Sequence, residues 1–239
     1  MRRVAPCRPK GGEGAGRCVR ALIGFFTVLP VKAELDFSCA WALPYVVAPI
    51  LGGLSALALI YLGPLPAYLL LLLLTGLNHL DGLADTADAL MVRDRERARA
   101  ALEDPRRGTA GIFAVVAAVA LAVNYLRSPW QLIFGEIFSK SLVVVLAAFS
   151  KPFKEGLGSA FVNAVRRKWL FATPALALAL MAYPSSSLAL ALSAAAYYIA
   201  YKHLGGANGD VLGYLLELSR VAFIAATSAF PLSISFPLW

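Results

Sequence analysis

The chain has 239 residues, of which 59% are hydrophobic and only 15% are charged, and its mean hydropathy is +0.70. This composition excludes an ordinary soluble domain and indicates a polytopic membrane protein. The net charge of +8 comes from basic residues that occur in groups, which points to orientation in a membrane. No surface of interleaved aromatic and basic residues is evident, so we expect no nucleic-acid partner.

The first 20 residues are rich in Gly, Pro and Arg and show no apolar periodicity, which predicts a disordered basic arm. Residues 21–30 are apolar, but charged residues follow where a signal peptide would carry small ones. We therefore predict an interfacial helix there and one integral-membrane domain over 21–239. The three cysteines, Cys7, Cys18 and Cys39, lack a CxxC spacing, so the sequence predicts neither a zinc site nor a disulfide framework.

Seven apolar segments then follow, each a candidate transmembrane helix. They cover residues 40–62, 65–90, 109–126, 130–149, 170–183, 187–201 and 211–230. The fifth and sixth are short and separated only by Tyr183, Pro184 and serines, so a broken or tilted pair is an alternative. The predicted fold class is an all-α bundle of about seven spans.

The basic residues are concentrated in connections that lie on one side of this predicted bundle. Residues 1–32 carry seven of them, 93–107 carry six and 151–168 carry five, while the intervening connections carry almost none. By the positive-inside rule, the N-terminus and these loops are cytoplasmic. The prediction is therefore a multi-pass protein of the cell membrane whose polar motifs share the cytoplasmic side.

The most informative stretch is NHLDGLADTAD, which directly follows a run of leucines. Asp81, Asp85 and Asp88 stand at i, i+4 and i+7 and form one acidic stripe on a helix. A carboxylate at mid-bilayer costs about 2.5–3.5 kcal/mol, so the stripe must lie near the interface, face a cavity or bind cations. The alternative is a helix end that has reached water. Carboxylates without thiols or clustered imidazoles favour Mg²⁺ as the cation.

Two glycine-rich loops complete the set of polar motifs. In EDPRRGTAG, residues 103–111, arginine forks and the amides of Gly108 and Gly111 suit a phosphate; the alternative is a turn with arginines as topology anchors. In GGANGDVLG, residues 205–213, Asp210 can complete a metal shell or the loop can cradle a diphosphate. The alternative is an ordinary loop with Asp210 as a helix N-cap.

Three further polar residues lie within the apolar segments. His79 is off the acidic stripe, which favours a packed histidine and leaves it as an outer candidate. Glu136 and Lys140 are one helical turn apart and are predicted to form an intrahelical ion pair rather than to act in catalysis.

The ordered motifs resemble those of the cobalamin synthase family, the adenosylcobinamide-GDP ribazoletransferases. TGLNHLDGLADTADAL, EDPRRGTAG, KEGLG and GGANGDVLGYLLEL carry the resemblance, which runs from Phe25 to Glu217. The first motif is close to the family's TGGLHLDGLADTADG, with matches at His79, Asp81, Gly82, Asp85 and Asp88. The second resembles D-S-R-x-G-x-x-G, with matches at Asp104, Arg106, Gly108 and Gly111. The third resembles G-G-x-T-G-D-x-x-G, with Asn208 in place of threonine.

What the resemblance implies is a transferase of the last steps of cobalamin biosynthesis. Adenosylcobinamide phosphate would pass from its GDP-activated form to α-ribazole, or to α-ribazole 5′-phosphate, with release of GMP. The implied roles are catalysis by Asp81, Asp85, Asp88 and Arg106 and binding of Mg²⁺ by Asp81, Asp85, Asp88 and Asp210. The implied substrate-binding residues are His79, Asp104, Arg107, Gly108, Gly111, Gly205, Gly206, Asn208 and Gly209.

Two other classes stay open at this point. A CDP-alcohol phosphatidyltransferase or a prenyltransferase also places aspartates at helical spacing near the interface, but the former's G-x3-D-x3-D pattern is absent from the sequence. An ion-coupled transporter uses intramembrane aspartates, but neither half of the chain repeats the acidic stripe. Membrane lipid is the expected surrounding, and a homo-oligomer and contacts with other cobalamin-biosynthesis enzymes stay open.

Overall fold

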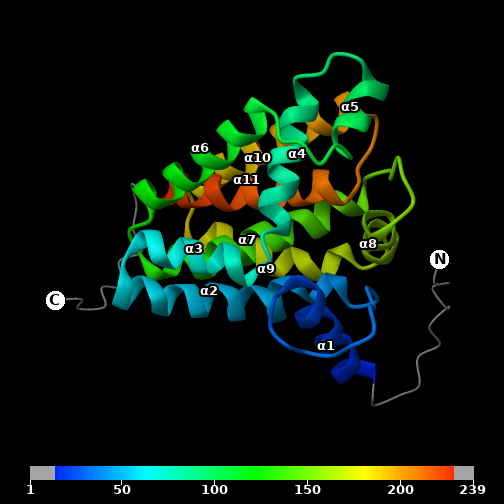
Figure 1. The fold of residues 1–239 in the computed structure, drawn as a ribbon. Helices are drawn as coiled ribbons and strands as arrows, with labels where there is room; N and C mark the ends of the chain where they lie inside the picture. The colour runs from blue at the N-terminus through cyan, green and yellow to red at the C-terminus, as the bar shows by residue number, and fades with distance from the viewer. Residues whose placement is uncertain (1–13, 229–239) are drawn as a thin grey trace.

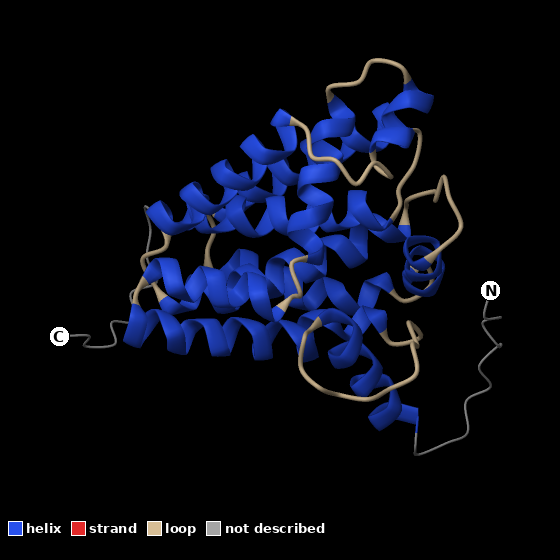
Figure 2. Ribbon diagram, in the orientation of Figure 1, coloured by secondary structure: helices blue, strands red, loops and turns tan. Residues whose placement is uncertain are grey.

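The computed structural model describes residues 14–228, and every regular element in that range is a helix (Figure 1, Figure 2). The elements in chain order are α1 (Gly14–Phe26), the 3-10 helix η1 (Ala40–Ala42), α2 (Leu43–Leu62), α3 (Pro64–Leu74), α4 (Asn78–Leu90), α5 (Arg95–Ala101), α6 (Thr109–Tyr125), α7 (Pro129–Ala148), α8 (Leu157–Val165), the 3-10 helix η2 (Trp169–Ala172), α9 (Thr173–Ala182), α10 (Ser186–Leu204) and α11 (Gly209–Thr227). The predicted all-α class is confirmed.

Helices occupy all seven segments predicted to span the membrane, although residues 229 and 230 of the seventh lie outside the described range. Within that range, Ala40–Leu62 and Pro129–Ala148 are long and apolar enough to cross a membrane, and a third span is counted if α3 and α4 are taken together. At 1.5 Å per residue, a 17-residue helix such as α6 rises only about 26 Å, short of the roughly 30 Å hydrocarbon core. The protein is thus a helical membrane protein, and the number of seven spans stays a prediction.

The predicted span over residues 65–90 is not one unbroken helix, because the chain bends by 90° between α3 and α4. Gly76 and Leu77 both have positive φ, at 67° and 62°, and Leu77 is therefore in a left-handed conformation that a leucine adopts only at a cost of about 1–3 kcal/mol. The leucine run gave no signal of this break beyond Gly76. As a result, α4 crosses the bundle and carries the acidic stripe across it (Figure 1).

Two expectations for the N-terminal region need correction. Helix α1 begins at Gly14, inside the segment predicted to be a disordered arm, while residues 1–13 lie outside the described range. A disulfide joins Cys18 of α1 to Cys39, with the Cα atoms 5.9 Å apart, whereas the sequence predicted none. The spacing of single cysteines could not reveal the pairing, because the loop that brings them together is built by tertiary packing.

Close backbone contacts position α4 and α2 in the bundle. A Cβ atom on Gly82 of α4 would lie 2.7 Å from the carbonyl oxygen of Asp210, and one on Gly52 of α2 would lie 2.7 Å from the Cα of Ile133 in α7. Small residues allow such approach between helices in membrane proteins. The contact at Gly82 brings the acidic stripe next to the start of α11.

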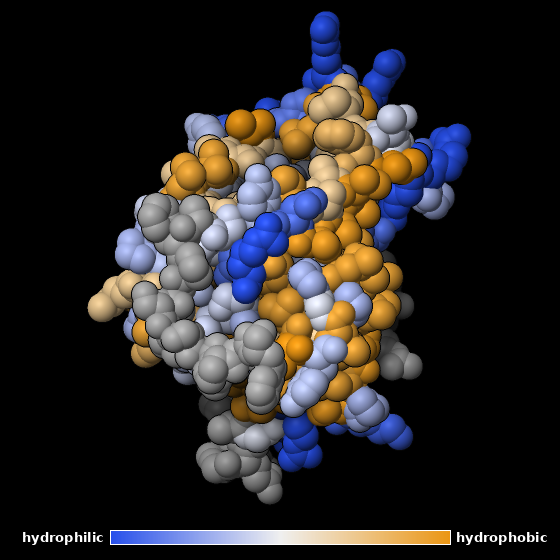
Figure 3. Space-filling view, turned by 90° about the vertical axis from the view of Figure 1, so that its left-hand side faces the viewer, coloured by the Kyte–Doolittle hydropathy of each residue, from blue (hydrophilic) through white to orange (hydrophobic). Residues whose placement is uncertain are grey.

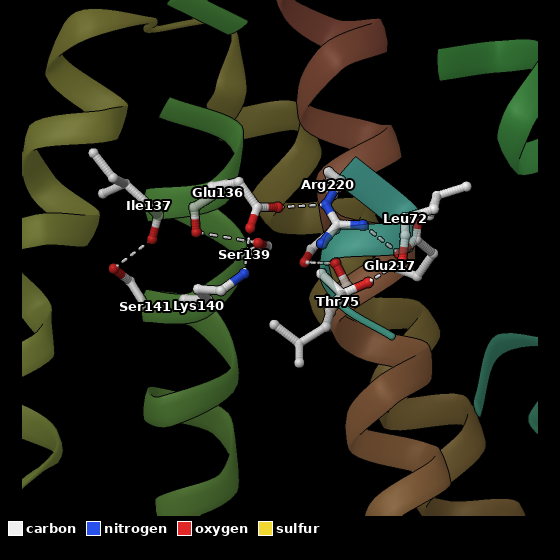
Figure 4. Close-up of polar contacts among 11 residues, drawn as sticks. Leu72, Thr75, Glu136, Ile137, Ser139, Lys140, Ser141, Glu217 and Arg220 are labelled. Atoms are coloured by element: carbon white, nitrogen blue, oxygen red, sulfur yellow. Dashed lines mark hydrogen bonds and ion pairs between the residues drawn. The ribbon is translucent and has the colours of Figure 1, made fainter. Parts of the chain in front are cut away.

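Four charged side chains are completely enclosed between α7 and α11 (Figure 4). Glu136 pairs with Lys140 on its own helix and with Arg220, and Arg220 also pairs with Glu217. Tyr68 of α3 donates its hydroxyl proton to Glu217. The predicted Glu136–Lys140 pair is confirmed, but its extension across to α11 was not foreseen. We call these four charges the buried ion cluster.

The surface has both hydrophobic and hydrophilic areas. Figure 3 shows a broad area of hydrophobic residues, with hydrophilic residues above and below it and a further hydrophilic group near the middle of the view. On the side of the bundle that carries α5 and α8 (Figure 1), Arg95 and Arg99 donate to the carbonyls of residues 202–205 at the end of α10. Lys154 pairs there with Glu103. The basic loops therefore gather at one end, as the topology prediction requires.

Candidate active site

The three aspartates of α4 lie on one helix but in different surroundings. The side chain of Asp81 is 57% exposed, whereas that of Asp85 is 8% exposed, and Asp88 is half-buried. Asp81 is therefore the most exposed of the three acids, and Asp85 in the middle is the most enclosed. A helix end that had simply reached water would expose its acids in the opposite order, because Asp88 is nearer the end of α4.

Arg107 is the arginine that reaches the stripe. Its guanidinium pairs through Nη1 with Asp85 and through Nη2 with Asp81. Arg106 instead turns back on Asp104, with an Nη2–Oδ2 distance of 2.8 Å and a side chain that is 88% exposed. The chain bends at Pro105 and Arg106, and the sequence alone did not show which arginine would face α4.

Asp88 binds the loop that follows α5 through hydrogen bonds. Its carboxylate accepts hydrogen bonds from the amide of Gly108 at 2.7 Å and from that of Gly111 at 2.8 Å. A Cβ atom on either glycine would collide with this carboxylate, so only glycine permits the contact. The predicted anion site at the start of α6 is thus filled by an anion of the chain itself, in keeping with the preference of helix N-termini for negative charge.

The loop before α11 is organised by Asn208. Its Oδ1 accepts from the amide of Val211 at 3.0 Å, and its Nδ2 donates to Asp210 at 2.7 Å. Asn208 is therefore the N-cap, and the alternative of Asp210 as the cap is wrong. Gly205 and Gly206 have φ of 70° and 151° and turn the chain away from α10, so both shape the loop. No atom lies within 4 Å of where a Cβ of Gly209 would stand.

Two cavities meet at Asn78 and Asp81. The first, of about 510 Å³, lies between α4 and α6 and is lined by residues that include Arg107, Gly111 and Val116; we call it the α4–α6 cavity. The second, of about 310 Å³, is lined by residues of α1, α4, α7, α8 and α11 that include His79, Leu157 and Asp210; we call it the α8–α11 cavity. Asp81 is therefore the carboxylate reached from both sides.

His79 and Gly158 belong to the α8–α11 cavity. His79 is 8% exposed, and its buried Nδ1 has no hydrogen-bond partner in the protein. A Cβ atom on Gly158 would lie 2.5 Å from the amide nitrogen of Gly209, so α8 approaches the loop before α11 closely. Gly158 is not among the predicted site residues, although the KEGLG motif that contains it is part of the resemblance.

The charge environment of the exposed loop is simple. The Arg106 guanidinium and amide both donate to Asp104, and these hydrogen bonds lower the pKa of Asp104 to about 2. The same pair raises the pKa of Arg106. The two side chains therefore stay ionised and paired at any ordinary pH, and neither lines a cavity described above.

Only some of the predicted carboxylate ligands are arranged to bind Mg²⁺. Among residues 14–228, no group of three or more His, Cys, Asp and Glu side chains gathers to hold a metal ion. Mg²⁺ is commonly held by one or two carboxylates together with substrate phosphates and water, and Asp81 and Asp85 already converge on one cationic group. Asp88 fits poorly because its oxygens accept from loop amides. Asp210 shares the α8–α11 cavity with Asp81.

Comparison with known proteins identifies the family. The family model for cobalamin-5-phosphate synthase matches residues 18–228. The chain is 64% identical to the adenosylcobinamide-GDP ribazoletransferase of Pyrobaculum calidifontis, over 87% of this chain and 97% of that protein. It is 56% identical to that of Pyrobaculum aerophilum, over 92% and 100%, and 30% identical to that of Thermoplasma acidophilum, over 86% and 89%.

No solved structure matches the chain. The sequence matches, in contrast, cover nearly all of the described residues and nearly the full length of the Pyrobaculum proteins. The acidic stripe, the Arg107 loop and the Asn208 loop all lie within the matched range. The chain belongs to the cobalamin-5-phosphate synthase family.

Proposed function

We propose that this chain transfers adenosylcobinamide phosphate from adenosylcobinamide-GDP to α-ribazole, or to its 5′-phosphate, and releases GMP. In this reaction, a ribose hydroxyl oxygen bonds to the phosphorus that bears the cobinamide. The bond from that phosphorus to the GMP oxygen breaks, and GMP leaves with the electron pair. The hydroxyl proton passes to an aspartate carboxylate. The observation that carries the proposal is Asp81, which stands where two cavities meet, beside Asp85 and Arg107.

The role proposed for each residue follows from its position in the site. Asp81 and Asp85 would hold Mg²⁺, which when bound neutralises diphosphate charge and stabilises the leaving group. Arg107, released from the two carboxylates, is placed to bind a phosphate in two-pronged fashion. Asp210 lines the α8–α11 cavity together with Asp81 and is proposed as the aspartate that accepts the proton. Asp88 would act by fixing the loop that carries Arg107.

The remaining predicted residues support this arrangement from the loops. Arg106 is proposed to neutralise charge on the departing GMP, and Asp104, which pairs with it, is proposed to bind substrate at the exposed end of the loop. Gly205, Gly206 and Gly209 are proposed to let the loop before α11 approach the diphosphate.

The reaction is tested directly with the purified protein in detergent. With Mg²⁺, adenosylcobinamide-GDP and α-ribazole, it should form a cobamide and GMP, and chelation of the metal should stop both because the diphosphate charge is then uncompensated. GMP release with the corrinoid alone would mean hydrolysis. Product from a CDP-activated lipid, or cation flux without GMP, would contradict the proposal in favour of a phosphatidyltransferase or a transporter.

We also propose that the site faces the cytoplasm of a multi-pass protein in the cell membrane. The basic loops at one end of the bundle support this orientation. Single cysteines placed in residues 93–107 or 203–210, in a variant with Cys7, Cys18 and Cys39 replaced by serine, should react with an impermeant reagent only from the cytoplasmic side. Labelling of the two loops from opposite sides would contradict the shared site.

A further inference from the structure

The two cavities that meet at Asp81 have different walls. The α4–α6 cavity carries the guanidinium of Arg107, and its other wall is the exposed apolar face of α6, where Ile112 and Val116 are 57% and 61% exposed. The α4–α6 cavity therefore opens toward the hydrophobic surroundings of the bundle, and it is the larger of these two cavities. The α8–α11 cavity is smaller and lies inside the bundle among five helices.

The inner wall of the α8–α11 cavity is aromatic. It is built by Phe25 and Phe26 of α1, Phe37 of the following loop and Phe161 of α8. Neighbouring rings in this group meet edge to face, with centroids 4.9 to 6.3 Å apart. Phe25 is the most open of them at 36% exposed, whereas the other three are buried. A planar aromatic group entering the cavity would therefore meet a preformed apolar wall.

Polar groups from α4 and α11 line the same cavity. Asp81 and Asp210 contribute carboxylates, and His79 contributes an imidazole whose Nδ1 is buried without a partner. A buried polar atom without a partner destabilises the protein, and a hydrogen bond to a ligand hydroxyl would remove that cost. A cavity with one apolar aromatic wall and one polar wall suits a molecule with a planar base and a sugar.

Size decides which substrate enters. Ligand pockets in proteins range from about 300 to 1,000 Å³, so a cavity of about 310 Å³ holds a nucleoside but not a corrin ring with its side chains. The α4–α6 cavity, of about 510 Å³ and open on one side, can receive part of a larger molecule and offers Arg107 to its phosphates.

We propose that the α8–α11 cavity binds the acceptor nucleoside, with its base against the Phe25 wall and its ribose toward His79, Asp81 and Asp210. The corrinoid donor then occupies the α4–α6 cavity, and the two substrates meet at Asp81 from opposite sides. This assignment rests on the proposed function. It adds which side of the acidic stripe each substrate takes, and it makes Phe25 and Leu157 determinants of affinity for the nucleoside alone.

Two matched substitutions test the assignment. Leu157 and Val116 line the two cavities and are 53% and 61% exposed, so tryptophan at either position fills a cavity without entering the core. Leu157→Trp should raise the KM for α-ribazole on the order of 10-fold and leave the KM for adenosylcobinamide-GDP within about twofold. Val116→Trp should raise the KM for adenosylcobinamide-GDP on the order of 10-fold and leave the KM for α-ribazole within about twofold. Leu157→Trp acting on the corrinoid alone, or on neither substrate, would overturn the proposal.

A binding measurement separates this inference from the reaction itself. Equilibrium dialysis of α-ribazole against the protein without corrinoid should give saturable binding, and Phe25→Ala should weaken it on the order of 10-fold through lost stacking. Unchanged binding in Phe25→Ala would overturn the assignment even in an active enzyme. A wild-type protein that binds α-ribazole but releases no GMP with both substrates would instead contradict the proposed function.

Discussion

The acidic stripe and the buried ion cluster are both sets of charges within an apolar helix bundle, yet they differ in what their charges can still bind. In the cluster, Glu136, Lys140, Glu217 and Arg220 sum to zero charge, and each is at most 1% exposed. In the stripe, Asp81 and Asp85 share one guanidinium and Asp88 accepts from neutral amides, so two negative charges are left over, and Asp81 is 57% exposed at two cavities.

This difference separates a structural set of charges from a site. Charges in a membrane segment are expensive and are commonly read as functional, but the cluster is enclosed, internally paired and touches no cavity described above. A buried pair of this kind is retained only if its geometry and hydrogen bonds offset desolvation. Openness and an unbalanced charge, rather than intramembrane charge alone, mark the stripe as the place for a cationic or phosphate ligand.

The largest expected effect breaks the cluster. Arg220→Met leaves Glu136 and Glu217 without their shared partner in a closed environment, which should destabilise the protein by about 3–5 kcal/mol. The midpoint of denaturant or thermal unfolding in detergent measures it. Arg106→Met, at an 88% exposed position, is the control and should change stability by less than about 0.5 kcal/mol. Equal losses of stability in the two variants would show that the buried ion cluster does not stabilise the fold.

The stripe should respond in activity and not in folding. Asp81→Asn and Asp85→Asn each remove a proposed metal ligand, so kcat/KM should fall roughly 100- to 1,000-fold, as for the loss of one strong electrostatic group, and the Mg²⁺ dependence should weaken. Membrane insertion should be retained, because a neutral side chain inserts more easily than a charged one. Near-normal turnover in both variants would return the stripe to the status of a helix end in water.

The two adjacent arginines sharpen the contrast within the site. Arg107→Lys loses the two-pronged contact, and with one charged hydrogen bond worth about 1.5–3 kcal/mol, kcat/KM should drop roughly 10- to 100-fold. Arg106→Lys should cost less, because its guanidinium is paired with Asp104 away from both cavities. Steady-state kinetics of the two variants decide the point, and a larger loss in Arg106→Lys would restore Arg106 as the principal phosphate contact.

A smaller effect is expected from backbone contact at the site. Gly82→Ala places a Cβ atom 2.7 Å from the Asp210 carbonyl oxygen, so α4 and α11 must separate, which costs about 1–3 kcal/mol and should lower activity as well. Gly53→Ala in α2 meets nothing within 4 Å and should stabilise by about 0.5–1 kcal/mol. Unfolding midpoints and turnover of the pair measure both, and a harmless Gly82→Ala would contradict the close approach.

The smallest effect concerns the exposed Asp104–Arg106 pair. Because the pKa of Asp104 is lowered to about 2, the pair contributes stability above the usual carboxyl pKa of about 4, and this is lost as pH falls toward 2. The difference in unfolding midpoint between wild type and Asp104→Asn should therefore be small and constant from pH 5 to 8 and vanish at the acid end. A difference that grew on acidification would contradict the lowered pKa.

Much of the fold follows from hydropathy. Helices occupy all seven predicted apolar segments because a backbone in an apolar surround must satisfy its own hydrogen bonds. The break at Gly76 and Leu77 could not be predicted, since leucine seldom adopts the left-handed conformation that Leu77 has. The same holds for the early start of α1 at Gly14 and for its disulfide.

The site was predictable in its residue types but not in its pairings. Helical spacing placed Asp81 and Asp85 on one face, and the Gly108 loop was rightly tied to an anion. The sequence could not show that this anion is Asp88, or that Arg107 rather than Arg106 faces α4, because loop direction depends on how α6 packs. The aromatic wall from α1 was missed for the same reason, since an interfacial helix gave no signal of lining a cavity.

The Cys18–Cys39 bond ties α1, which carries Phe25 and Phe26, to the segment that carries Phe37. Disulfides are rare in a cytosol kept reduced by glutathione and thioredoxin, and hyperthermophilic archaea are an exception. A mesophilic host with a reducing cytosol would therefore deliver this chain as a dithiol, with the aromatic wall held by packing alone. Recombinant material should be assayed both oxidised and reduced before a weak affinity for the nucleoside is attributed to any substitution.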